Sequence, residues 1–197
     1  MLIVGINGSP HNDGNVAHLL CVALEEAKKK GATVFIENVC DVFEGQKKPY
    51  CDACSSPCNR SCFEGTLLEE SFEHLSKADA IILGSPVYFG TVSAQLKAYW
   101  DKTRALRTEK LLLGTIGGAV AVGASKFGGQ ESTIRTLHDM MLIQGMNIVG
   151  DGAFEFDAGH QGVCGVRPVE EDSNAVKRAK ILGIRIFEEA RKTVSES

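Results

Sequence analysis

The sequence lacks the features that would place it in a membrane or on a nucleic acid. No apolar run approaches the roughly 20 residues that a membrane-spanning helix needs, and the chain does not open with the basic and apolar regions of a secretory signal. The formal net charge is −4, whereas nucleic-acid-binding proteins usually present a basic surface. We therefore expect neither a membrane nor a nucleic acid as a partner.

Several nucleotide-binding and catalytic signatures are also absent. The first apolar segment is not followed by the dinucleotide fingerprint G-x-G-x-x-G, and no segment matches the P-loop pattern G-x-x-x-x-G-K-[ST]. The five histidines are scattered without the spacing of metal ligands, and the loops offer no Ser/His/Asp or Cys/His triad. We therefore name no catalytic side chain and expect any chemistry to come from a cofactor.

The composition is that of an ordinary globular protein. The chain has 197 residues, of which 44% are hydrophobic and 23% charged, and this length predicts one domain over residues 1–197. Seven cysteines are present. Because an odd number without a secretory signal argues against a framework of disulfides, we expect a reducing compartment, the cytoplasm.

Short apolar segments alternate with segments of helical periodicity along the chain. Strands are expected at residues 2–7, 33–36, 80–83, 115–122 and 146–149, helices at 15–30, 66–77, 93–107, 131–144 and 170–192, and irregular segments at about 41–65 and 151–167. Such alternation predicts an α/β fold with a doubly wound, five-stranded parallel sheet. The insert at 41–65 follows the second strand, and an irregular segment with a final helix at about 151–193 closes the chain.

Three unusual loops follow the first, third and fourth expected strands. In parallel sheets, ligands bind beyond the carboxyl ends of the strands, and small residues let the backbone approach a ligand closely. The first loop leads into a helix, whose N-terminal amides favour a phosphate, with Ser9 and Asn15 as added donors. No Lys or Arg lies between Met1 and Lys28. The loops together predict a mononucleotide, with an ordinary βα turn and core aromatics at Tyr88 and Phe89 as the alternatives.

The loop sequences resemble a known family. The segments Gly8-Ser-Pro-x-x-x-Gly-Asn15, Gly84-Ser-Pro-Val-Tyr-Phe-Gly90 and Gly128-Gly-Gln-Glu131 look like the flavodoxin-like NAD(P)H-dependent FMN reductases. The resemblance implies a flavodoxin-like fold in which the FMN phosphate is held by Ser9, His11, Asn15 and Val16. It implies that the isoalloxazine is lined by Pro86, Val87, Tyr88, Phe89 and Gly90, and closed on its other side by Ser125, Gly128 and Gly129. The family usually has Arg or Lys at the position of His11 and Thr at that of Val16.

Four of the cysteines are clustered within the insert, in the run Cys51-x2-Cys54-x3-Cys58-x3-Cys62. Four thiolates bind either a [4Fe–4S] cluster or structural zinc. A single compact run fits one cluster better than the paired knuckles of a zinc ribbon. With these cysteines the chain resembles the iron–sulfur flavoprotein branch of the family, although that branch typically shows C-x2-C-x2-C before a longer last gap. Zinc, reversible disulfides and an empty remnant stay open. Cys21, on the first expected helix, is expected to pack in the core.

The sequence therefore favours a redox protein that passes electrons between FMN and a [4Fe–4S] cluster. The resemblance implies a homodimer or homotetramer with a ferredoxin-like electron donor. One alternative is an NAD(P)H-dependent FMN or quinone reductase whose cysteines are structural or bind zinc. Another is a non-enzymatic interaction module stabilised by zinc.

Overall fold

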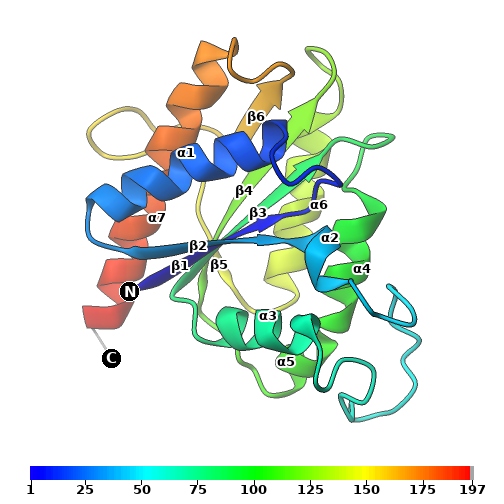
Figure 1. Cartoon of the computed structure of the whole chain (residues 1–197). Helices are drawn as coiled ribbons and strands as arrows, with labels where there is room; N and C mark the ends of the chain where they lie inside the picture. The colour runs from blue at the N-terminus through cyan, green and yellow to red at the C-terminus, as the bar shows by residue number, and fades with distance from the viewer. Residues whose placement is uncertain (196–197) are drawn as a thin grey trace.

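A parallel sheet with helices on both faces forms the centre of the molecule (Figure 1). The computed structural model describes residues 1–195, with side chains through residue 193. Five strands lie in the order β2-β1-β3-β4-β5, which confirms the predicted doubly wound sheet. Their bounds are β1 Leu2–Asn7, β2 Thr33–Asn38, β3 Ala80–Pro86, β4 Ile116–Gly123 and β5 Asn147–Ile148.

A sixth strand corrects the expectation of an irregular segment at 151–167. Strand β6 (Val163–Val166) pairs in parallel with β4 from Val120 to Gly123, whereas β5 pairs with Ile116 and Gly117. Thus β5 and β6 are two pieces of one edge position, interrupted by residues 149–162. The prediction missed β6 because four residues, one of them glycine, carry too little periodicity to mark a strand.

The helices divide between the two faces of the sheet. Helices α1 (Asn15–Lys29) and α7 (Ser173–Ser195) cover one face, as Figure 1 shows in blue and orange-red. The other face is covered by α2 (Val39–Val42), α3 (Leu67–Ser76), α4 (Ala94–Lys102), α5 (Arg104–Thr108) and α6 (Gln130–Leu142). The helix expected at 93–107 is therefore two helices, and α7 begins at residue 173 instead of 170. No helix in residues 1–195 has the length and apolarity that crossing a membrane requires.

Side chains of β1 alternate between the two cores, as its period of two requires. Ile3 packs with α1 and α7, whereas Val4 and Ile6 pack with the helices of the opposite face. Helices α1 and α7 cross closely at Gly183, where an added Cβ would lie 2.0 Å from the carbonyl oxygen of Ala23. This crossing holds α1, and with it the loop that precedes α1, against the sheet.

We expect Gly183→Ala to lower the free energy of unfolding by about 1–3 kcal/mol, because the added methyl forces the two helices apart. The intrinsic preference of alanine for helix, about 1 kcal/mol over glycine, acts in the opposite direction. Urea denaturation measures the difference, with Lys180→Ala on the exposed side of α7 as the control. A Gly183→Ala protein as stable as wild type would contradict the close crossing.

Candidate functional site

The loops after β1, β3 and β4 are hydrogen-bonded together at the carboxyl edge of the sheet. The Gly8 amide donates to the carbonyl of Gly84 at 2.8 Å, and the Val87 amide donates to the carbonyl of Val122 at 2.8 Å. The hydroxyl of Ser93, buried at the start of α4, donates to the carbonyl of Gly8 at 2.5 Å. The structure therefore brings the three predicted loops to one place.

Asn7, which the sequence analysis did not single out, shapes the first loop. Its fully buried amide accepts from the Ser9 amide at 3.1 Å and donates to the carbonyl of His11 at 3.1 Å and to Asn38 Oδ1 at 3.0 Å. Ser9 Oγ in turn accepts from the His11 amide at 3.1 Å. An asparagine that ends an otherwise apolar strand is the signal that could have identified this role.

The four residues predicted to bind the FMN phosphate differ in exposure and in the hydrogen-bond donors that they have free. Ser9 and Val16 are buried. The Val16 side chain packs against the backbone of Gly84, where an added Cβ would lie only 2.7 Å from Val16 Cγ1. Asn15 Oδ1 accepts from the Val169 amide at 2.9 Å, which leaves only its amide nitrogen free to donate. His11 is exposed. Since no side chain caps α1, its N-terminal amides are available for an anion.

The two loops predicted at a flat ring present aromatic side chains to solvent. Phe89 and Phe127 are both fully exposed, and both have positive φ, 50° and 56°. Tyr88 is 43% exposed. Core packing is therefore the wrong interpretation of Phe89. Residues with side chains rarely hold positive φ, and such positions cluster at functional sites.

Gln130, at the start of α6, fixes the loop after β4. Its Oε1 accepts from the Gly128 amide at 2.9 Å, and its Nε2 donates to the carbonyl of Ser125 at 2.7 Å. The Ser132 hydroxyl then donates to the carbonyl of Gly90 at 2.9 Å and joins this loop to the one after β3. Of the predicted ring residues in this loop, Gly129 lies beside Val87 and Gly90, since an added Cβ there would contact both at 3.2 Å, whereas Gly128 lies against Ser125.

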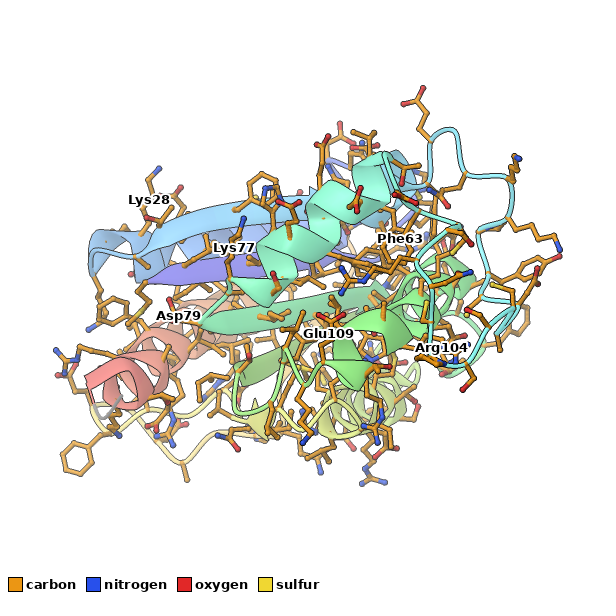
Figure 2. All side chains as sticks on the ribbon, turned by 90° about the horizontal axis from the view of Figure 1, so that it is seen from below. Lys28, Phe63, Lys77, Asp79, Arg104 and Glu109 are labelled. Carbon is orange, nitrogen blue, oxygen red and sulfur yellow. The ribbon has the colours of Figure 1, made fainter. Side chains whose placement is uncertain are left out.

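The cysteine segment, residues 45–66, is a surface loop anchored at both ends. Gln46 Nε2 donates to Thr66 Oγ1 at 2.9 Å and closes the base of the loop. The buried ring of Phe63 packs edge-on against Phe72, with ring centroids 5.1 Å apart. Arg60 pairs with Glu109, which lies in the turn directly after α5. Figure 2 shows Phe63 and Arg104 on the side of the molecule where this pale-cyan segment projects.

All four cysteines of the segment line one cavity of about 390 Å³. The Ala53 amide lies 3.4 Å from Cys51 Sγ as a donor, an interaction typical of metal-bound thiolates. In the described part of the chain no three Cys, His, Asp or Glu side chains are drawn together as a metal site. The residues fit a thiolate-bound group in their chemistry and in facing a common space.

Two other cysteines lie outside this cavity. Burial raises the pKa of Cys40, whose Sγ lies 3.8 Å from the carbonyl of Ser9. Burial, with Glu131 and Asp151, raises the pKa of Cys164 to about 11. Both thiols are therefore protonated near neutral pH and are poor nucleophiles and metal ligands. Cys21 is exposed, so the expected core packing of this residue is wrong.

The first loop is also tied to the helix from which the cysteine segment leaves. Asn12 Nδ2 donates to both carboxylate oxygens of Asp41 in α2, at 2.8 and 2.9 Å. The loop after β1 and the cysteine segment are thus supported by the same short helix, α2.

Comparison with known proteins identifies the family. The family model described as NADPH-dependent FMN reductase matches residues 1–161. The chain belongs to this family. An iron-sulfur flavoprotein of Methanocaldococcus jannaschii is 38% identical over 193 residues, covering 95% of this chain and 96% of the relative. One of Methanosarcina thermophila is 38% identical over 178 residues, covering 88% and 86%. The chain therefore belongs to the iron–sulfur flavoprotein branch and is an FMN-binding, flavin-dependent oxidoreductase.

Solved structures share the flavodoxin-like fold at low sequence identity. A flavodoxin described as WrbA-like, from Agrobacterium tumefaciens, matches with a TM-score of 0.66 and 21% identity over 97% of both chains. RosB, solved with a bound flavin intermediate, matches with a TM-score of 0.76 and 12% identity over 100% of this chain and 81% of its own.

We expect Gln130→Ala to raise the dissociation constant of FMN about tenfold, because the loop of residues 124–129 loses its hydrogen bonds and tenfold corresponds to about one buried hydrogen bond. Flavin fluorescence quenching on titration of the apoprotein measures it. The control is Gln144→Ala: Gln144 is equally buried, at 6% exposure, but bonds Thr103 Oγ1 near the amino ends of β4 and β5. Equal FMN affinity in the two variants would contradict the role of Gln130.

Proposed function

We propose that this protein is a single-domain carrier that passes electrons between FMN at the carboxyl edge of the sheet and a [4Fe–4S] cluster in the cysteine segment. The observation that carries the proposal is that Cys51, Cys54, Cys58 and Cys62 all line one cavity. Two relatives covered over most of their length are named iron-sulfur flavoproteins. When bound, FMN supplies one- and two-electron chemistry and the cluster one-electron chemistry.

The chain's own residues bind and orient these groups. The amides of Asn15 and Val16, with Ser9, His11 and the Asn15 side-chain nitrogen nearby, would hold the phosphate by hydrogen bonds and the helix dipole instead of by countercharge. The flavin ring would lie between residues 86–90 and the loop containing Ser125, Gly128 and Gly129. Gln130 and Ser132 hold the backbone of these loops through the Gly128 amide and the carbonyls of Ser125 and Gly90, so the ring environment would need little reorganisation.

Partners follow from the same surface. Phe89 and Phe127 project fully exposed from the two ring loops, and exposed aromatic side chains at a site favour coverage by another chain. We propose a homodimer or homotetramer in which a second copy covers these rings. A ferredoxin-like protein is the proposed electron donor, and the cytoplasm the proposed location.

We expect Cys58→Ser to lose iron and the broad thiolate-to-iron absorption while FMN remains bound, because Cys58 lines a cavity to which residues 8–16, 86–90 and 124–129 do not contribute. Iron, zinc and flavin are quantified on anaerobically purified protein. Cys21→Ser, which removes an exposed thiol on α1, is the control. Zinc in place of iron in the wild-type protein would refute the cluster.

A second candidate function is an NAD(P)H-dependent FMN or quinone reductase. The family description names NADPH. An NAD(P)H dehydrogenase (quinone) of Chromohalobacter salexigens is 42% identical over 76 residues, which cover 39% of this chain and 38% of that relative. This match covers too little of either chain to carry the whole activity across.

Anaerobic mixing with NADPH or NADH separates the two candidates. If the protein is an electron carrier served by ferredoxin-like donors, neither nicotinamide bleaches the flavin band in a stopped-flow instrument, whereas reduced ferredoxin does. Bleaching by NADPH within the time of a turnover would favour the reductase.

A further inference from the structure

A lysine is buried behind the cysteine cavity. Lys102, the last residue of α4, is 3% exposed. Lysines normally extend their ammonium groups to water even when the aliphatic stem is covered. Here Nζ lies 3.8 Å from Cys62 Sγ, and this sulfur is its only polar partner among the residues that the structure describes.

A single thiol is a poor partner for a buried ammonium group. A neutral S–H is a weak acceptor, and an ammonium removed from water is costly unless a negative charge compensates it. Lys102 belongs to the lining of the same cavity as the four cysteines. Its position is therefore explained if the cavity holds an anion.

The acidic side chains at the cavity are too few to balance its cations. Lys48 is paired with Asp52 at 2.6 Å. Lys47 and Arg104 also line the cavity, and the remaining acidic side chain there is that of Glu64. Among these cations, Lys102 is the buried one, and charges excluded from solvent interact most strongly.

We infer that Lys102 is the countercharge for the thiolate-bound group held by Cys51, Cys54, Cys58 and Cys62, and that it raises the reduction potential of a cluster bound there. This inference rests on the proposed function. A [4Fe–4S] core held by four thiolates is anionic, and one-electron reduction adds to its negative charge. A nearby fixed cation stabilises the reduced form more than the oxidised form. Lys102 is thus a positioning residue and touches no substrate.

Lys102→Gln tests the inference, with a redox titration of the anaerobic protein followed by electron paramagnetic resonance. We expect the equilibrium constant for cluster reduction to fall at least tenfold, a midpoint potential lower by 59 mV. Lys102→Arg, which keeps the charge, should change this constant less than threefold. The control is Lys97→Gln, which removes the same charge from the exposed side of α4, where Lys97 pairs with Asp101 at 2.6 Å.

Lys102→Met, which fills a similar volume without a polar group, is the second variant and should lower the potential as Lys102→Gln does. Flavin content and thermal unfolding report whether each variant folds. An unchanged potential in both variants would overturn the role of Lys102 while leaving the cluster established. Failure of both to fold would assign Lys102 to the packing of α4 and would also overturn it. A wild-type protein without iron would instead overturn the proposed function.

Discussion

One buried hydroxyl joins the parts of the protein on which the site depends. Ser93 Oγ donates to the carbonyl of Gly8 and accepts from the Leu96 amide at 3.2 Å, while the Ser93 amide donates to Ser85 Oγ at 3.0 Å. These bonds link the first loop, the end of β3 and the N-terminus of α4. Because the hydroxyl is fully buried, each bond forms without competition from water, and the loops are fixed relative to the helix.

The two proposed cofactor positions follow from the length of α4. Ser93 caps this helix beside the loops that follow β1 and β3, and Lys102 ends it at the cysteine cavity. A helix rises about 1.5 Å per residue, so the nine residues of α4 span about 14 Å. The same rigid element therefore sets the separation between the loop edge and the thiols. Tyr99 and Trp100, both buried, hold the helix in the core between them.

Much of the fold could be predicted because its signals are local. Apolar strands and helical periodicity predicted the order of the elements, and the small residues after three strands predicted loops that meet at one edge of the sheet. The rest depends on contacts distant in sequence. The break between α4 and α5 arises at Thr103, whose Oγ1 donates to the carbonyl of Trp100 at 2.6 Å and accepts from Gln144 Nε2 at 2.6 Å. No pattern within residues 93–107 reveals that partner.

The candidate site shows the same division. The loop glycines and the clustered thiols were visible in the sequence, but the burial of Val16 beneath Gly84 and the bonds made by Gln130 were not, because each requires knowing which segments meet. Lys102 is the clearest example. It lies at the end of an ordinary helical pattern, and the sequence does not reveal that the segment around Cys62, 40 residues earlier, packs beside it in the folded chain.

The unusual cysteine spacing is compatible with four thiols around one space because the backbone turns sharply between them. Ala53 and Arg60 have φ of 49° and 64°, a left-handed conformation that residues with side chains adopt at a cost. One of these turns lies between Cys51 and Cys54 and the other between Cys58 and Cys62. A strained backbone conformation persists only where surrounding contacts hold it in place. Here those contacts are the packing of Phe63 against Phe72 and the hydrogen bond from Gln46 to Thr66. The direction that the backbone takes at Ala53 and Arg60 therefore matters more for the positions of the thiols than the number of residues between them.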